Sequence, residues 1–182
     1  NEENLESIEQ SVKAATGAAK EAMVDCEHFF DGYKANPDYA LACAKTAYDA
    51  GTRWVVLCDT NGGTQPSEVR EIVKAVIAAG VPGDHLGIHA HNDTGQAVAN
   101  SLAAVEAGVR QVQGTLNGIG ERCGNANLVT IIPTLVLKPT YNTRFETGID
   151  AEKLQGLTQL AHAFDELLNR APDHQAPYVG AS

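Results

Sequence analysis

The stretch GIHAHNDTG, residues 87–95, sets two histidines one residue apart at the end of an apolar run. HLGIHA (85–90) predicts a strand, and Asp93 with Gln96 resembles a capping box that opens a helix over 94–107, ending at Gly108. Strand side chains alternate between faces, so His89 and His91 should project the same way. Two imidazoles on one face are suited to bind a metal ion together. The alternative is that one histidine bonds a carbonyl and the other caps a helix.

The same alternation of strand and helix extends in both directions from this stretch. We expect strands at 22–30, 54–59 and 109–114, and helices at 3–20, 37–50, 64–80, 127–135 and 151–170. Short strands separated by helices indicate parallel βαβ units. Two architectures fit: an open doubly wound sheet, or part of a (β/α)8 barrel. Since a complete barrel needs about 250 residues, four strands would be half of one.

Composition narrows the class of protein. The 182 residues are 43% hydrophobic, and 23 acidic against 13 basic residues give a formal net charge of −10. The charge balance and the lack of a basic run argue against nucleic acid as a partner, and the lack of a long apolar run argues against a membrane. The cysteines lie far apart, which predicts buried thiols in a reducing, cytoplasmic setting rather than a disulfide framework. They are Cys26, Cys43, Cys58 and Cys123.

Three other strand ends carry polar groups. NGIGERCGN (117–125) misses the G-x-G-x-x-G nucleotide fingerprint by one residue, but its glycines would let Asn125 approach a cleft. Thr60, in DTNGG (59–63), would lie at a strand mouth or form a helix-entry turn. Glu27, among aromatics, would be a partly desolvated base with a raised pKa, or an ordinary surface carboxylate. Because four strand ends converge on one rim, we favour a metal site there.

Two motifs in combination, HAHND (89–93) and GIGERCGNANL (118–128), resemble the Claisen-condensing branch of the metal-dependent TIM-barrel lyase/synthase family. Its members are the 2-isopropylmalate, homocitrate and citramalate synthases, with 3-hydroxy-3-methylglutaryl-CoA (HMG-CoA) lyase as a distant relative. The resemblance implies an α/β fold, a partial TIM barrel comprising the second half. Residues 1–139 would form that half, and 140–182 would form a helical extension toward a further C-terminal region.

The resemblance also implies roles for individual residues. His89 and His91 would ligate a divalent cation, which could be Mg2+, Mn2+ or Zn2+, with Asn125 as a longer-range ligand. Thr60 would hold the carboxylate of a 2-oxo acid, and Glu27 would be a base or an orienting residue near an acetyl group. Two residues of the glycine loop would order that loop around the substrate: Glu121 and Arg122.

The implied activity is condensation of acetyl-CoA with a 2-oxo acid in branched-chain amino acid synthesis, by a homodimer. EHFFDGYKANP (27–37) and LCDTNGGT (57–64) most resemble the citramalate synthases, which favours pyruvate. The alternatives are 2-isopropylmalate or homocitrate synthesis, aldol-type cleavage using a loop cysteine, and a catalytically incomplete barrel or scaffold. We expect Cys123 to be a buried thiol. The sequence lacks the family's first-strand Asp-Arg-Glu motif and the histidine that follows the barrel.

Overall fold

A computed structural model describes residues 1–18 and 21–181 of the chain. The chain divides into two compact units, residues 1–113 and 114–182, and each is described separately below. The first unit contains every strand of the sheet. The predicted division at residue 139/140 concerns the extent of the barrel half and stays a prediction.

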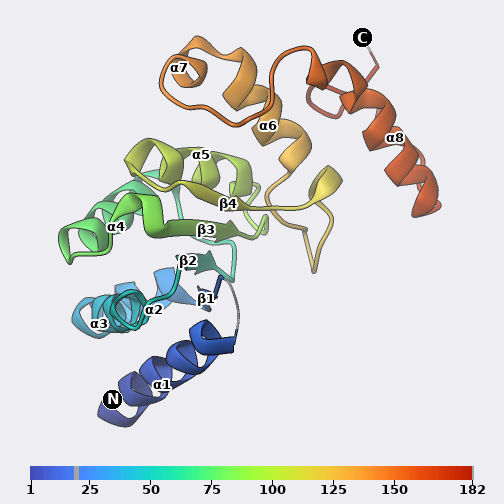
Figure 1. The fold of residues 1–182 in the computed structure, drawn as a ribbon. Helices are drawn as coiled ribbons and strands as arrows, with labels where there is room; N and C mark the ends of the chain where they lie inside the picture. Colours follow the sequence, from blue (N-terminus) through green and yellow to red (C-terminus); the bar gives the residue numbers. More distant parts are fainter. Residues whose placement is uncertain (19–20, 182) are drawn as a thin grey trace. The chain divides into compact units, whose positions relative to one another are not determined.

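The first unit alternates helices with the strands of one parallel sheet (Figure 1). The strands occur side by side in sequence order, β1-β2-β3-β4. A doubly wound sheet would reverse its strand order at a switch point, so this order favours the barrel over the alternative that the sequence left open. The elements are α1 (Glu2–Ala18), β1 (Met23–Cys26), α2 (Phe29–Ala35), α3 (Pro37–Asp49), β2 (Trp54–Asp59), α4 (Pro66–Ala78), η1 (Gly83–His85), β3 (Leu86–Ala90), α5 (Ala97–Ala107) and β4 (Gln111–Gln113).

The two faces of the sheet differ, and the sheet is curved. One face carries Val55, Leu57 and Ile88, which are completely buried. The opposite face carries Asp25 on β1 and Gln113 on β4. These two side chains hydrogen-bond, Nε2 to Oδ1, at 3.1 Å although β2 and β3 lie between their strands. Side chains of the first and fourth strands can meet only across a concave face, as in the interior of a barrel.

Most helices begin where the sequence predicts. Asn36 caps α3 by accepting a hydrogen bond from the backbone N–H of Tyr39 at 3.2 Å, with Pro37 at the first helical position. Helix α4 begins at Pro66 behind a capping box, in which Glu68 accepts from the backbone N–H of Gln65 at 2.7 Å. These caps satisfy N–H groups that have no partner within the helix.

Several predicted elements differ in the structure. The helix expected at 151–170 covers only Leu157–Leu167, and the strand expected at 109–114 covers only Gln111–Gln113. The last two residues of the helix expected at 3–20 lie outside the described residues.

Two further differences can be traced to particular residues. The strand expected at 22–30 ends at Cys26, because His28 takes a left-handed conformation (φ 56°) and the chain turns into α2. Phe30 favours strands by propensity, but here it is buried within a helix, so packing overrides propensity. Helix α5 begins at Ala97 rather than at 94, and the capping box at Asp93 is wrong. The side chain of Asn92 instead accepts from the backbone N–H of Ala97, at 3.2 Å.

The second unit is built from helices and loops. Asn127 caps α6 by accepting from the backbone N–H of Val129 at 2.9 Å. Val129, Ala161 and Val179 form the buried core of this unit. The elements are η2 (Leu116–Gly118), α6 (Leu128–Leu137), α7 (Pro139–Asn142), η3 (Lys153–Gly156) and α8 (Leu157–Leu167). Within the described residues, no helix has the length and apolar character needed to cross a bilayer.

Candidate metal site and strand-end residues

His89 and His91 lie together at the carboxyl end of β3. Their ring centroids are 5.2 Å apart and their planes differ by 21°, so the rings are nearly parallel. His89 is half-buried and His91 is buried. The backbone of His91 also donates to the carbonyl of Asp59, at 3.2 Å, which ties the residue to the end of β2. The alternation argument therefore placed both imidazoles correctly on one side of the strand.

The spacing of the two rings fits a shared cation. A metal ion lies about 2.1 Å from an imidazole nitrogen, and hence roughly 3.3 Å from the ring centroid. Two rings that ligate one ion must therefore have centroids within roughly 6.5 Å of each other. The observed separation of His89 and His91, 5.2 Å, satisfies this limit.

A second group of potential ligands surrounds His89. Ligand atoms of Asp25, Cys58 and His89 all lie within 4.8 Å of one another. Burial raises the pKa of the Cys58 thiol, and the charges of Asp25 and Glu27 raise it further, so the protonated thiol is favoured there. A neutral thiol is a poor ligand, since it is the thiolate that binds metals. Cys58 is therefore the poorest candidate ligand of this cluster.

Gln113 connects Asp25 to His89. Its Oε1 lies 2.8 Å from Nδ1 of His89, and its Nε2 donates to Oδ1 of Asp25 at 3.1 Å. The pairing of His89 with Gln113 across β3 and β4 sets this contact. Neither Gln113 nor Asp25 was identified from the sequence. The available signal was the alternation of QVQ (111–113), which puts two glutamines on one face of a strand.

Thr60 and Glu27, predicted at two different strand ends, are in direct contact. The Thr60 hydroxyl donates to Oε2 of Glu27 at 2.9 Å and accepts from the backbone N–H of His28 at 2.8 Å. Glu27 is exposed in the described chain, so the partial burial expected for it is not found. The structure brings the predicted substrate-binding hydroxyl and the predicted base together.

Asn125 lies in the glycine-rich loop of the second unit. Its Nδ2 donates to the carbonyl of Ile119 at 3.2 Å, and its backbone N–H donates to the carbonyl of Gly118 at 3.0 Å. A Cβ on Gly120 would lie 2.1 Å from Nδ2 of Asn125, so the loop needs glycine at this position. Asn125 belongs to a different unit from the histidines, and its part in the metal site stays a prediction.

Glu121 and Arg122 lie at the tip of the same loop. Their closest charged atoms are 4.0 Å apart, and the Glu121 side chain is 82% exposed, so their ion pair contributes little to stability. The backbone N–H of Gly124 donates to the carbonyl of Glu121 at 2.9 Å, which closes a turn over residues 121–124. Their predicted roles toward substrate stay predictions.

The thiols only partly match expectation. Cys58 is buried, while Cys26 and Cys43 are half-buried, and none of the four forms a disulfide. Cys123 is exposed, so its prediction as a buried thiol is wrong. Gly120 and Gly124 flank this part of the loop and contribute no side chains that could cover the thiol.

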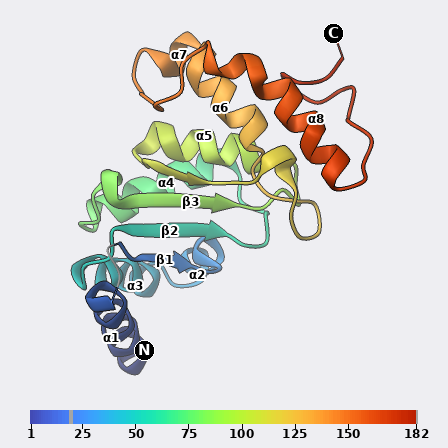
Figure 2. The ribbon, with the colours of Figure 1, turned by 45° about the vertical axis from the view of Figure 1, so that its right-hand side comes forward.

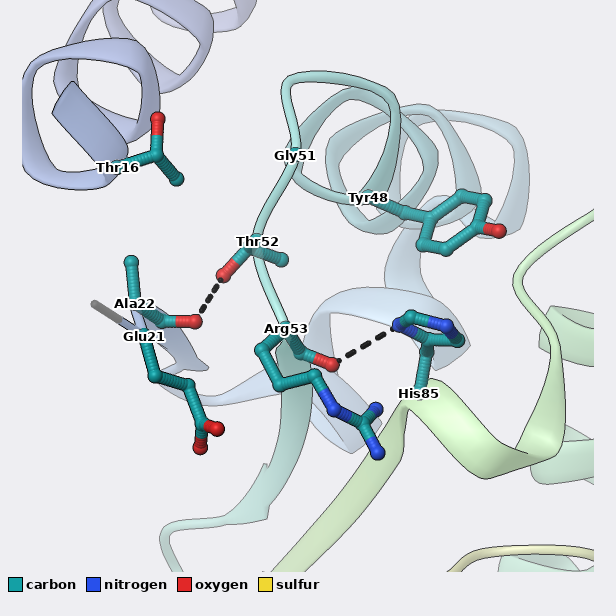
Figure 3. Close-up of a pocket in the computed structure, with 8 residues that line it drawn as sticks. All are labelled: Thr16, Glu21, Ala22, Tyr48, Gly51, Thr52, Arg53 and His85. Atoms are coloured by element: carbon teal, nitrogen blue, oxygen red, sulfur yellow. Dashed lines mark hydrogen bonds between the residues drawn. The ribbon is translucent and has the colours of Figure 1, made fainter. Parts of the chain in front are cut away.

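A separate cavity of about 480 Å³ lies at the amino ends of the strands (Figure 3). Its polar groups are used by the protein itself. The Thr52 hydroxyl donates to the carbonyl of Ala22 at 3.0 Å, and Nδ1 of His85 bonds the carbonyl of Arg53 at 3.0 Å. The residues Ala22, Arg53 and His85 immediately precede strands, which places this cavity at the opposite end of the sheet from His91. In (β/α)8 barrels that end serves stability, whereas the carboxyl end carries the chemistry.

Solved structures share this fold. HMG-CoA lyase from Pseudomonas aeruginosa superposes with a TM-score of 0.72 at 22% identity, covering 93% of this chain and 57% of the lyase chain. An HMG-CoA lyase from Acinetobacter baumannii, solved in complex with coenzyme A and 3-methylmalate, gives a TM-score of 0.63 at 25% identity. It covers 80% of this chain and 47% of the other. The expected fold class, a partial TIM barrel, is confirmed.

Several curated proteins are similar to this chain in sequence. The chain is 52% identical to the (R)-citramalate synthase of Synechocystis sp., over 99% of this chain and 33% of that protein. It is 51% identical to the (R)-citramalate synthase of Aquifex aeolicus, over 100% of this chain and 33% of that protein. A 2-isopropylmalate synthase from Stenotrophomonas maltophilia is 38% identical over 87% of this chain. The chain spans about one third of the length of these relatives. The HMGL-like family profile matches residues 1–161, and the chain belongs to that family.

Proposed function

We propose that the protein condenses acetyl-CoA with a 2-oxo acid, and that pyruvate is the preferred acid, giving citramalate. The observation that carries this proposal is the gradient of identity among relatives. Five (R)-citramalate synthases are 44% to 52% identical over nearly the whole chain, whereas three 2-isopropylmalate synthases are 38% identical over 82% to 87% of it. The strand-end constellation of imidazoles, hydroxyl and carboxylate supplies groups suited to the reaction.

In this proposal His89 and His91 hold a divalent cation, and Asn125 contributes its amide oxygen. An amide binds a cation through its oxygen, and Nδ2 of Asn125 donates to the carbonyl of Ile119, so Oδ1 is the atom that would act as the ligand. The bound cation supplies Lewis-acid polarisation of the keto group. Nitrogen and oxygen donors suit Mg2+, Mn2+ and Zn2+.

Thr60 and Glu27 act on the two substrates. The Thr60 hydroxyl binds the carboxylate of the 2-oxo acid, and Glu27 removes a proton from the acetyl methyl group or orients that group. The Thr60–Glu27 hydrogen bond, 2.9 Å, links these roles because one hydroxyl proton cannot serve both carboxylates. Binding of the 2-oxo acid would thus redirect the Thr60 hydroxyl from Glu27 to the substrate carboxylate. Glu121 and Arg122 complete the substrate-binding loop.

The test measures acetyl-CoA-dependent release of coenzyme A by the full-length protein, with pyruvate and with 2-oxoisovalerate, and identifies the product by mass spectrometry. We expect kcat/KM to be at least tenfold higher with pyruvate. Higher kcat/KM with 2-oxoisovalerate would assign 2-isopropylmalate synthesis instead. Absence of turnover with either acid would overturn the proposal.

A substitution pair tests the metal assignment. His89→Ala should lose both bound metal and turnover, because one ligand is removed. The matched control is His174→Ala, an exposed histidine in the second unit that should change neither. If His89→Ala retains its metal stoichiometry, His89 is not a ligand.

Aldol-type cleavage is the second candidate, because Cys123 is exposed in the glycine loop rather than buried. The two reactions separate by one variant. Cys123→Ser should leave the condensation rate within twofold of wild type if the thiol has no chemical role. Loss of turnover in this variant would show that the thiol takes part in the chemistry, as the cleavage candidate requires.

Resemblance to the synthases supports two further proposals, that the full-length protein is a homodimer and that it resides in the cytoplasm. Light scattering coupled to size-exclusion chromatography and cell fractionation test them. A monomeric mass, or recovery outside the cytoplasmic fraction, would contradict the respective proposal.

A further inference from the structure

The contacts of Gln113 determine which nitrogen of His89 carries a proton. A carboxylate accepts hydrogen bonds and cannot donate them, so the amide of Gln113 must turn its NH2 group toward Asp25. Its carbonyl oxygen then faces Nδ1 of His89, at 2.8 Å. Because a carbonyl oxygen only accepts, Nδ1 must be the donor. A neutral imidazole that is protonated on Nδ1 carries its lone pair on Nε2.

We propose that Gln113 is a positioning residue that holds His89 in the Nδ1–H tautomer and so presents Nε2 to the divalent cation. This inference rests on the assignment of His89 as a metal ligand in the proposed function. Asp25 acts through Gln113: its carboxylate fixes the orientation of the amide, and the amide fixes the imidazole.

Two features of the sheet make this arrangement specific. Strand register places Gln113 opposite His89, and curvature brings Asp25 of β1 within reach of Gln113. Gln111 lies on the same strand and face but two residues earlier, opposite Gly87, and its buried Oε1 has no hydrogen-bond partner among the described residues. Gln113 hydrogen-bonds to His89 and Asp25, whereas Gln111 lies opposite Gly87 on the same strand face. This makes Gln111 a matched control.

The test compares variants of the full-length protein. Gln113→Leu keeps the size of the side chain and removes both hydrogen bonds. Gln111→Leu is the control on the same strand. The double variant Asp25→Asn/Gln113→Glu exchanges amide and carboxylate, so that residue 25 now donates and residue 113 accepts from both neighbours. Net charge is unchanged, and Nδ1 of His89 again has an acceptor.

Metal affinity is measured by titrating Mn2+ or Zn2+ into the metal-free protein in a calorimeter. Loss of an outer partner of a ligating histidine typically weakens metal binding about 10- to 100-fold, and this is the loss that we expect for Gln113→Leu. Gln111→Leu should bind as tightly as wild type, and the exchanged pair should recover to within about threefold. If Gln113 acts only by packing against its neighbours, the double variant Asp25→Asn/Gln113→Glu would not recover metal affinity.

The tautomer is read directly from long-range ¹H–¹⁵N correlation spectra of metal-free protein labelled at histidine. We expect wild type and the exchanged pair to show His89 protonated on Nδ1, and Gln113→Leu to show a mixture. Metal affinity within twofold of wild type in Gln113→Leu, or His89 protonated on Nε2 in wild type, would overturn the inference.

The two readouts need no substrate, so they separate this inference from the proposed function. If His89→Ala loses the metal and Gln113→Leu does not, the inference alone fails. If His89→Ala binds metal as wild type does, the ligand assignment fails, and the inference fails with it.

Discussion

Gly87 lies on β3 two residues before His89, and a single methyl group at this position should lower the stability of the fold. A Cβ at this position would lie 2.2 Å from Oε1 of Gln111 and 2.9 Å from Cγ2 of Val56. Both distances are shorter than real Cβ contacts. The amide end of Gln111, on the edge strand β4, would have to turn aside, whereas Val56 on β2 is completely buried and has little room to move. Inserting a methyl group into a filled core typically costs about 1–3 kcal/mol. We expect Gly87→Ala to lower the free energy of unfolding by that amount.

A glycine-to-alanine substitution at another position should instead raise the free energy of unfolding. Gly32 lies inside α2, and a Cβ there would meet no atom within 4 Å. Replacing a helical glycine by alanine removes backbone entropy from the unfolded chain and favours the helix by about 0.5–1 kcal/mol. Gly32→Ala should therefore be stabilising, so that the two alanine variants differ by about 1.5–4 kcal/mol when the loss at Gly87 is added.

The assay is urea unfolding of the full-length protein, followed by the fluorescence of Trp54 on β2. A lower midpoint with an unchanged m-value reports a change in stability. The physical cause is isolated by a double-mutant cycle with Gln111→Ala, which removes the closer of the two colliding atoms. In that background the cost of Gly87→Ala should fall by at least about 1 kcal/mol. Part of the cost should remain, because the contact with Val56 is unchanged. The steric reasoning is refuted if Gly87→Ala matches wild type, or if its cost is the same with and without Gln111.

Three further predictions concern thiols and helix caps. At pH 8 iodoacetamide should label Cys123 at least tenfold faster than Cys26, as measured by peptide mapping with mass spectrometry. Cys123 is exposed, whereas burial raises the pKa of the Cys26 thiol to about 12 and so disfavours the reactive thiolate. Equal labelling rates would contradict this prediction. The backbone N–H of Gln65 and the side chain of Lys34 lower the pKa of Glu68. Because the Glu68 side chain is 42% exposed and solvent screens these interactions, Glu68→Gln should cost only about 0.5 kcal/mol at neutral pH. That contribution is present above the ordinary value of 4.5 and is lost as the pH falls through the lowered pKa, so denaturation near pH 3 should show little difference. Asn36→Ala should cost about 0.5–2 kcal/mol in urea unfolding at any pH from 5 to 8, and an unchanged midpoint would show that the cap is dispensable.

Much of the fold follows from local rules. WVVLCD at 54–59 is bounded by turn residues and forms β2 at the predicted residues, because a β-branched run buried on both faces has no competing helical pattern. Asn36 and Pro37 mark the start of α3 for reasons that lie within one turn of helix. Phe30 failed as a strand residue because its burial in α2 depends on neighbours far along the chain.

The site divides along the same line. Alternation along one strand is a local property, and it placed His89 and His91 together correctly. The bond between Gln113 and Asp25 joins residues 88 positions apart and requires the curvature of the whole sheet. No pattern within either strand contains that information. The sequence could therefore identify candidate ligands, while the residue that orients one of them emerged only from the structure.

Asp59 shows how one residue fixes the rim on which the predicted groups stand. Its side chain points away from the concave face and is only 2% exposed, and it accepts hydrogen bonds from the Thr64 hydroxyl at 2.8 Å and from Asn100 on α5 at 3.3 Å. Its carbonyl accepts from the backbone N–H of His91 at 3.2 Å. Thr60, the next residue, faces the opposite way and bonds the predicted base. A buried carboxylate that bonds Thr64 and Asn100 on the helix-covered side of the sheet thereby holds the backbone from which both a predicted ligand and a predicted substrate-binding hydroxyl project. Figure 2 shows β2 and β3 running side by side toward this rim. Thr60 directly follows β2, and His91 directly follows β3.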